Sequence, residues 1–453
     1  MKFAIQIFAI LATAFFRMPD ANAHDSIYAA YVVLGNNGQG IARVITGAQD
    51  CPSIEFDGKP GKMHLRASPA SVPVRPGSLK DAQFPVRVCE AKLPLHVRHI
   101  SVAGKALPVP RENPQRIVVI GDTGCRMNLN EHAFQSCTDP EKWAFGQIST
   151  AAAAFKPDLV IHVGDYLYRE SPCPKGARGC AGSPWGYGFD SWQADFFEPA
   201  KRLLAAAPWV MVRGNHESCF RAGQGWFRFL DTQSFAPSRS CDNPENDARG
   251  DFSEPYSVPI ASDTQLIVFD SSKAANSAYS PEDSIYQRYL SQFRKVDELA
   301  GRMPHSFFLS HQPVLAFAPG EGQESGVTQP GNRALQSVMQ ALHPVRLFSP
   351  GIDAAFHGHV HLFEALDFAD DHPAAVVTGN SGTATDSPLP KALPEGAQPA
   401  PGAMVRRIIS GTGIGFLTIE RIGKHWLITE RNRYGKPQVR CTLRGQSLLC
   451  ARL

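Results

Sequence analysis

Beyond residue 116, short apolar runs alternate with helical stretches, and almost every run ends in a polar side chain. The apolar runs are residues 117–120, 159–163, 209–212, 266–269 and 306–309. The helical stretches are residues 141–155, 192–206, 281–299 and 333–342. Continuous apolar strands that alternate with helices indicate a sheet covered on both faces. Because ligands bind beyond the carboxyl ends of the strands in such sheets, the pattern predicts an α/β domain with its functional site at that edge.

Five short motifs follow strands of this domain and carry side chains that can bind metal. They are Gly121-Asp122-Thr123-Gly124, Gly164-Asp165-Tyr166-Leu167-Tyr168, Gly214-Asn215-His216-Glu217, Ser310-His311-Gln312-Pro313 and Gly358-His359-Val360-His361. Taken singly, a Gly-Asp pair after a strand is usually a turn or a helix cap. Together the motifs bring two carboxylates, an amide, three imidazoles and a phenol to one edge of the sheet. The set predicts a two-metal site built by Asp122, Asp165, Tyr168, Asn215, His311, His359 and His361.

The region before this domain has a different sequence pattern. Residues 24–112 contain only short runs rich in Val, Ile, Leu and aromatic residues, separated by Gly- and Pro-rich turns. Such a pattern predicts a small N-terminal all-β sandwich domain. The Pro-rich segment 107–114 is interpreted as the linker to the α/β domain that carries the metal-binding motifs, at 113–453.

The first 23 residues have the features of a secretory signal peptide. Lys2 precedes an apolar run at 3–16, and Ala21-Asn22-Ala23 provides a cleavage site before His24. A membrane anchor is the alternative, but the run is too short to span a bilayer comfortably. We therefore expect a secreted or periplasmic protein that has no membrane contact after cleavage.

Ten cysteines remain in the exported part, and an even number in an oxidising compartment is expected to pair. A cysteine-based metal site is the alternative, but the spacings do not resemble CxxC pairs. Pairing between near neighbours closes the shortest loops. It predicts the disulfides Cys51–Cys89, Cys125–Cys137, Cys173–Cys180, Cys219–Cys241 and Cys441–Cys450.

The composition narrows the range of partners. Hydrophobic residues make up 43% of the chain and charged residues 19%, as in an ordinary soluble globular protein. The formal net charge of +3 is too small to indicate binding to nucleic acid or to an anionic membrane surface.

The order of the motifs resembles the calcineurin-like metallophosphoesterases, and within them the purple acid phosphatases. The resemblance covers about residues 116 to 430. Many metallophosphoesterases open with Asp-x-His, whereas position 124 is Gly here and Tyr168 follows Asp165 by three residues, which is the purple acid phosphatase pattern. One departure is the fourth motif, usually Val-x-x-His, which begins with Phe308 in this chain. The resemblance implies a two-sheet sandwich flanked by helices, of the α/β/β/α type.

The resemblance also implies roles for individual residues. The family's ferric-site ligands match Asp122, Asp165, Tyr168 and His361. The ligands of its divalent site match Asp165, Asn215, His311 and His359, so that Asp165 bridges both ions. His216 matches the catalytic histidine that contacts phosphate and assists the leaving group; a hydrogen-bonding role alone is the alternative. A phenol titrates near pH 10, so only a strongly charged hard cation holds it as phenolate, which favours Fe(III) at Tyr168. The second site suits Fe, Zn or Mn.

The function that the resemblance implies is hydrolysis of small-molecule phosphomonoesters at acid pH, by direct attack of a metal-activated hydroxide. Two alternatives stay open: a phosphodiesterase with the same two metals, and a non-catalytic exported binding protein on this scaffold. The sequence does not indicate the physiological substrate, the second metal or the oligomeric state.

Overall fold

The computed structural model describes residues 27–320 and 328–453. Its largest sheet has eleven strands. The strand order is β28 (Ser447–Arg452), β27 (Pro437–Arg444), β26 (His425–Asn432), β25 (Gly415–Ile422), β11 (Arg116–Ile120), β14 (Leu159–His162), β15 (Trp209–Met211), β1 (Ile27–Leu34), β2 (Gly40–Thr46), β8 (Arg87–Lys92) and β5 (His64–Ala67). The central strands β11, β14 and β15 are parallel, so their carboxyl ends lie at the same edge.

The second sheet has seven strands and carries the later motifs. Its order is β16 (Tyr256–Pro259), β17 (Thr264–Val268), β18 (His305–Leu309), β21 (Ile352–His357), β23 (Ala374–Thr378), β22 (Phe363–Phe368) and β24 (Val405–Gly411). Strands β17, β18, β21 and β23 are parallel. All five apolar runs expected from the sequence therefore lie in strands, namely β11, β14, β15, β17 and β18.

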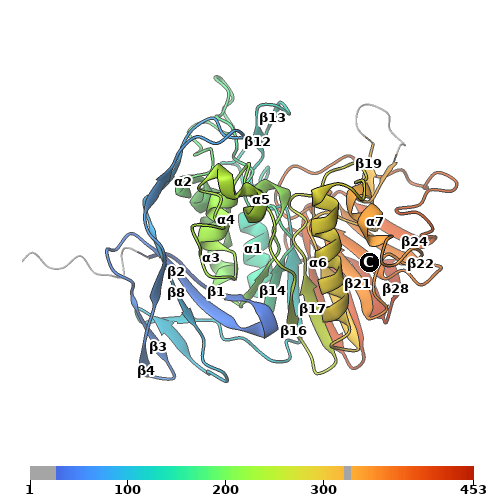
Figure 1. Cartoon of the computed structure of the whole chain (residues 1–453), viewed down its shortest axis with the longest axis horizontal. Helices are drawn as coiled ribbons and strands as arrows, with labels where there is room; N and C mark the ends of the chain where they lie inside the picture. Colours follow the sequence, from blue (N-terminus) through green and yellow to red (C-terminus); the bar gives the residue numbers. More distant parts are fainter. Residues whose placement is uncertain (1–26, 321–327) are drawn as a thin grey trace, which may run out of the picture.

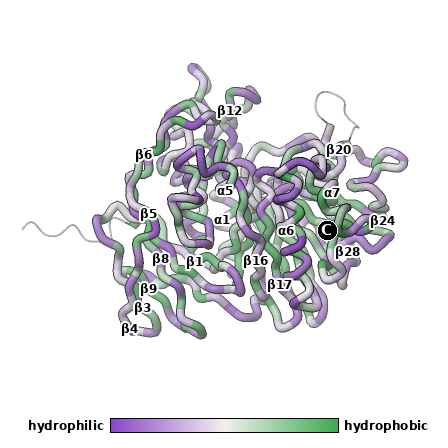
Figure 2. Tube along the Cα trace, viewed as in Figure 1, coloured by the Kyte–Doolittle hydropathy of each residue, from purple (hydrophilic) through white to green (hydrophobic). Residues whose placement is uncertain are grey.

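The two sheets pack face to face and helices cover their outer faces (Figure 1). Ile117 and Val119 of β11 face the second sheet, while Val118 and Ile120 face the helices. Because side chains alternate along a strand, a strand buried on both faces must be apolar throughout. The covering helices are α1 (Phe145–Ala154), α2 (Phe189–Trp192), α3 (Glu198–Leu204) and α4 (Gly223–Phe229) on the first sheet, and α6 (Ser284–Ala300) and α7 (Arg333–Met339) on the second. Four layers result, the α/β/β/α class that the family resemblance implied. Figure 2 shows hydrophobic residues concentrated along these central strands.

The N-terminal region is rich in strands, as expected, but its strands β1, β2, β8 and β5 continue the eleven-stranded sheet. Strand β1 pairs in parallel with β15, with Val33 opposite Trp209. A four-stranded sheet packs against β1, β2 and β8 and shares one buried cluster with them. This small sheet consists of β10 (Lys105–Leu107), β9 (Ile100–Val102), β3 (Ser53–Phe56) and β4 (Lys59–Lys62). The sequence did not indicate the shared sheet, and the domain boundary at residue 112 remains a prediction.

The predicted cysteine pairing is confirmed. All five disulfides form as expected, and the described residues contain no free cysteine. The predicted signal peptide at 1–23 lies outside the described residues. Within 27–320 and 328–453, no helix combines the length and apolar character that crossing a bilayer requires.

Candidate metal centre

The motif side chains are presented by unusual backbone at the strand ends. Asp122 after β11 has φ 56°, Asp165 after β14 has φ 60°, and His359 has φ 70°. Residues other than glycine rarely adopt this left-handed backbone conformation. Backbone strain of this kind concentrates at functional sites. The neighbouring glycines allow close approach, because a Cβ atom on Gly214 would clash with the Asp165 carboxylate and one on Gly358 would lie 2.5 Å from Asp122 Oδ2. The motif glycines thus make room for the carboxylates.

Tyr168 lies at the centre of one group of buried donor atoms. Its hydroxyl oxygen is 2.9 Å from Asp122 Oδ1, 2.9 Å from Asp165 Oδ2 and 3.0 Å from His361 Nε2. All four side chains are buried, with at most 4% of any residue exposed. A single hydroxyl hydrogen cannot satisfy both carboxylate oxygens, whereas one cation among the four groups would.

A second group of donor atoms shares Asp165 with the first. Asp165 Oδ2 is 3.1 Å from His311 Nε2. Asn215 Oδ1 lies 2.9 Å from His311 Nε2 and 3.0 Å from His359 Nδ1. Asp165, His311 and His359 each offer a ligand atom within 4.8 Å of the others, close enough to hold one metal ion. The structure therefore brings together all seven residues that the sequence singled out as ligands; their roles as ligands remain predictions.

The electrostatics of the cluster favour a bound cation. Burial, with Asp122 and Asp165, raises the pKa of Tyr168 well above its usual value, so the phenol stays protonated unless a positive charge is added. Burial lowers the pKa of His311, but Asp165 and Asp122 outweigh it and raise that pKa to about 9. Burial, and then His311, lower the pKa of His359 to about 3. A neutral imidazole beside buried carboxylates is the state in which histidine binds metals.

Further groups orient two of the imidazoles. His311 Nδ1 lies 3.0 Å from the carbonyl oxygen of Val163, so Nε2 faces the cluster. The backbone N–H of His361 donates to Asp386 at 2.8 Å, and its ring Nδ1 is 3.6 Å from the same carboxylate. Such outer contacts fix ring orientation in metal sites.

Glu217 has a structural role that the sequence analysis missed. This fully buried carboxylate holds the second and third motifs together through backbone N–H groups. It accepts hydrogen bonds from the N–H groups of Asp165 (3.1 Å), Tyr166 (2.9 Å), Leu167 (3.3 Å) and Gly214 (3.2 Å). Burial, and then the charge of Asp165, raise the pKa of Glu217 to about 8. In the sequence, only the position of Glu217 directly after Asn215 and His216 could have indicated this role.

Asp195 joins the first and second motifs in the same way. Its carboxylate accepts from the N–H of Cys125 at 3.0 Å and of Tyr168 at 2.8 Å, and pairs with Arg169 at 2.5 Å. Asp195 lies in a helical stretch that also contains Gln193 and Glu198, and nothing in the local sequence pattern marks it.

His216 lies beside the cluster in a polar contact chain. Its Nε2 is 3.7 Å from Asp165 Oδ2, and its Nδ1 is 3.2 Å from both Glu170 Oε1 and the carbonyl oxygen of Leu167. Arg221 binds both oxygens of Glu170, at 2.7 and 2.9 Å. Burial raises the pKa of Glu170, but His216 and Arg221 outweigh it and lower that pKa to about 2. The carboxylate is thus ionised and holds the imidazole in place.

Comparison with known proteins gives the family. The calcineurin-like phosphoesterase family model matches residues 115–363, more than half of the chain. The chain therefore belongs to the calcineurin-like phosphoesterases, a class of metal-dependent phosphoester hydrolases. No curated protein matches the sequence.

Two solved structures share the fold at low sequence identity. A purple acid phosphatase from yellow lupin (Lupinus luteus) seeds is 14% identical, with a TM-score of 0.56 over 94% of this chain and 74% of the lupin chain. PhoD is 10% identical, with a TM-score of 0.52 over 96% of this chain and 93% of the PhoD chain. At these identities the likeness concerns the fold alone.

Proposed function

We propose that the chain is an exported binuclear-metal phosphatase that hydrolyses phosphomonoesters at acid pH. The observation that carries the proposal is the position of the Tyr168 hydroxyl, 2.9 Å from each of two buried carboxylates and 3.0 Å from His361. This donor set combines a phenol with two carboxylates, which suits a trivalent hard cation.

The donor groups divide into two overlapping sites. Fe(III) would be held by Asp122, Asp165, Tyr168 and His361, and a divalent Fe, Zn or Mn ion by Asp165, Asn215, His311 and His359. When bound, such a pair supplies a nucleophile from water and positive charge that stabilises the phosphoryl group in transfer. The chain's own contribution is to hold the donor atoms in a buried, strained arrangement before substrate arrives.

His216 is the residue that would assist departure of the alcohol. Its Nε2 faces Asp165, while Glu170 and the carbonyl of Leu167 hold its Nδ1. With Nδ1 occupied as a donor, Nε2 is the nitrogen that can carry a proton to the leaving oxygen. Export is supported by five disulfides, which persist only in oxidising compartments.

The metal assignment is tested by Tyr168→Phe against a matched control. The wild-type protein should contain iron and show a tyrosinate-to-Fe(III) absorption band in the visible range, and Tyr168→Phe should lose that band. Tyr166→Phe is the control, because Tyr166 is equally buried but donates to the carbonyl of Val212 at 2.9 Å, away from the donor cluster. A colourless, iron-free wild-type enzyme with full activity would refute the ferric assignment.

The reaction is tested with mono- and bis-p-nitrophenyl phosphate between pH 4 and pH 9. We expect faster hydrolysis of the monoester, with an acid optimum. Preference for the diester would establish a phosphodiesterase instead. No hydrolysis of either ester by fully metallated protein would indicate a binding protein.

A further inference from the structure

A pocket of about 580 Å³ adjoins the metal centre and is built from distant parts of the chain. Asn215 and Glu170 come from the motif loops, Phe220 and Arg221 from the loop that follows His216, and Lys273 from the loop that follows β17. Another part of the wall is residues 76–79, which belong to the N-terminal region. The pocket therefore depends on a segment outside the catalytic motifs.

The pocket lies where the departing alcohol would be. Asn215 immediately precedes His216 in the chain, and Glu170 contacts the ring of His216. Both Asn215 and Glu170 line the pocket. A second pocket of about 470 Å³ borders His359 and Asp386 instead. Since His216 is the group proposed to protonate the leaving oxygen, the first pocket is the one that would receive the leaving group.

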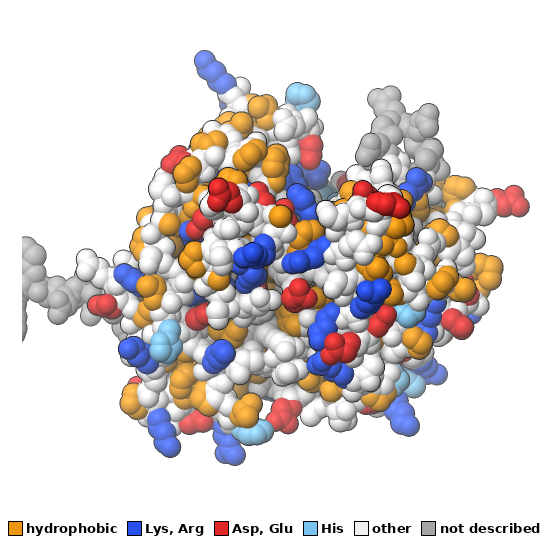
Figure 3. Space-filling view, viewed as in Figure 1, with side chains coloured by type: hydrophobic (Ala, Val, Ile, Leu, Met, Phe, Trp, Pro, Cys, Tyr) orange, Lys and Arg blue, Asp and Glu red, His pale blue; other side chains and the backbone are white. Residues whose placement is uncertain are grey.

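Three large, exposed apolar side chains line this pocket beside polar ones such as Asn130 and Lys273. Leu79, Leu129 and Phe220 line it and are 61%, 48% and 50% exposed. Large apolar side chains grouped at a functional pocket mark a binding surface for an apolar group. Figure 3 shows Lys and Arg side chains gathered near the upper centre of the molecule in this view. Hydrophobic side chains lie around these basic side chains.

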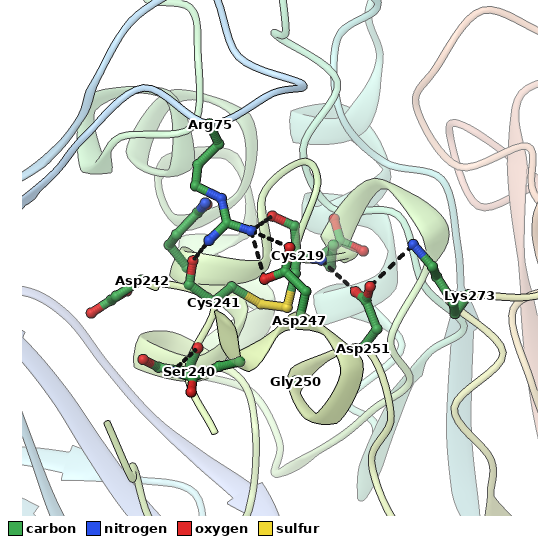
Figure 4. Close-up of a disulfide and its surroundings, with 12 residues drawn as sticks. Arg75, Cys219, Ser240, Cys241, Asp242, Asp247, Gly250, Asp251 and Lys273 are labelled. Atoms are coloured by element: carbon green, nitrogen blue, oxygen red, sulfur yellow. Dashed lines mark hydrogen bonds and ion pairs between the residues drawn. A yellow bond between two sulfur atoms is a disulfide. The ribbon is translucent and has the colours of Figure 1, made fainter. Parts of the chain in front are cut away.

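Arg75 fixes the N-terminal wall to the loop that carries Phe220. Its buried side chain donates to the carbonyl oxygens of Cys241 at 2.6 Å and Cys219 at 3.2 Å, and pairs with Asp247 at 2.5 Å. Figure 4 shows this guanidinium pointing at the Cys219–Cys241 disulfide, which closes the loop containing Phe220. A buried arginine that donates to two carbonyl oxygens and to a carboxylate holds a fixed geometry.

The wall and the aromatic ring are in direct contact. A Cβ atom on Gly77 would clash with the carbonyl oxygen of Phe220 and lie 2.5 Å from its ring. The Tyr187 hydroxyl donates to the Gly77 carbonyl at 3.3 Å. The segment 76–79 and Phe220 thus form one preorganised surface.

We propose that residues 76–79 and Phe220 form a leaving-group subsite that selects phosphate esters of alcohols bearing an aromatic or other apolar group. The subsite rests on the proposed phosphatase function and assigns the N-terminal region a part in specificity. Arg75 acts as a positioning residue, because it touches the wall and the loop but not the donor cluster.

The test compares 2-phenylethyl phosphate with ethyl phosphate, whose leaving groups are both primary alcohols and differ in the phenyl ring. Wild-type enzyme should have the higher kcat/KM for the phenylethyl ester. Phe220→Ala and Leu79→Ala should each lower that value by about tenfold, a size typical of lost apolar contacts in a substrate pocket. Both variants should change kcat/KM for ethyl phosphate less than about twofold.

Two matched control variants and the Arg75→Ala variant complete the test. Tyr434→Ala and Ile422→Ala remove side chains that are 66% and 56% exposed but do not line this pocket, and should leave the ratio of the two esters unchanged. Arg75→Ala should lower the ratio with unchanged metal content. An equal fall for both esters in the Phe220 and Leu79 variants, or no wild-type preference, would overturn the subsite alone. Failure of wild-type enzyme on both esters would overturn the phosphatase function itself.

Discussion

Replacing Glu217 by Ala tests whether a buried carboxylate outside the ligand set maintains the metal centre. The side chain is fully buried, and its two oxygens accept four backbone N–H groups, at 2.9 to 3.3 Å. Three of these N–H groups belong to consecutive residues of the loop that carries Asp165 and Tyr168. Removing the carboxylate leaves all four donors without their acceptor.

The expected cost follows from the number of donors. A buried donor without an acceptor costs about 1–3 kcal/mol. A water molecule in the vacated space has two acceptor lone pairs and can satisfy two of the four donors. Two bare donors would then cost about 2–6 kcal/mol. Burial and the charge of Asp165 raise the pKa of Glu217 to about 8, so the variant also loses an electrostatic penalty, and the net loss is smaller than this sum.

The assay is urea unfolding of the metal-free variants, followed by metal content and activity of the loaded proteins. Glu364→Ala is the matched control, because Glu364 is also fully buried but accepts only from the N–H of Phe317, at 3.1 Å. Glu217→Ala should lose at least about 1.5 kcal/mol more than the control, with an unchanged m-value, and should lose metal affinity and activity. Equal stability losses in the two variants, or Glu217→Ala with normal metal binding, would refute the reasoning.

The remaining predictions concern a positioning residue, the buried carboxyl group of Glu430 and metal removal. Glu170→Gln should lower kcat by about tenfold to a hundredfold with unchanged metal content, because the imidazole of His216 loses a charged partner; an unchanged kcat would contradict this role. Burial raises the pKa of Glu430 to about 7, so its proton stabilises the folded state fully below the unfolded pKa near 4.5, and this stabilisation is lost as pH rises through 7. Glu430→Gln should therefore be up to about 3 kcal/mol more stable than wild type at pH 8 and equal at pH 4, measured by urea unfolding at both pH values. Chelation should abolish activity and lower Tm, and metal should restore both, since the buried carboxylates Asp122 and Asp165 then lack a counter-ion; a Tm that chelation leaves unchanged would argue against the site.

The sequence by itself determined the sheet that is covered on both faces and the convergence of the motifs. Runs such as 117–120 are apolar at every position, which is typical of a strand covered on both faces. The carboxyl ends of parallel strands meet at one edge, so Asp122 and Asp165 had to lie close together. The five disulfides were predictable because short loops close most readily in an exported chain.

Only the tertiary structure decided how the N-terminal region joins the catalytic sheet and which residues support the motifs. The pairing of β1 with β15 is made by backbone groups, which every sequence possesses, so Val33 and Trp209 carry no signal of their contact. Glu217, Asp195 and Arg75 act on backbone atoms that lie close in space but, for most of their contacts, far away in the chain. Their roles depend on distances that exist only after both sheets have packed, because a hydrogen bond forms within about 3.5 Å regardless of separation in sequence.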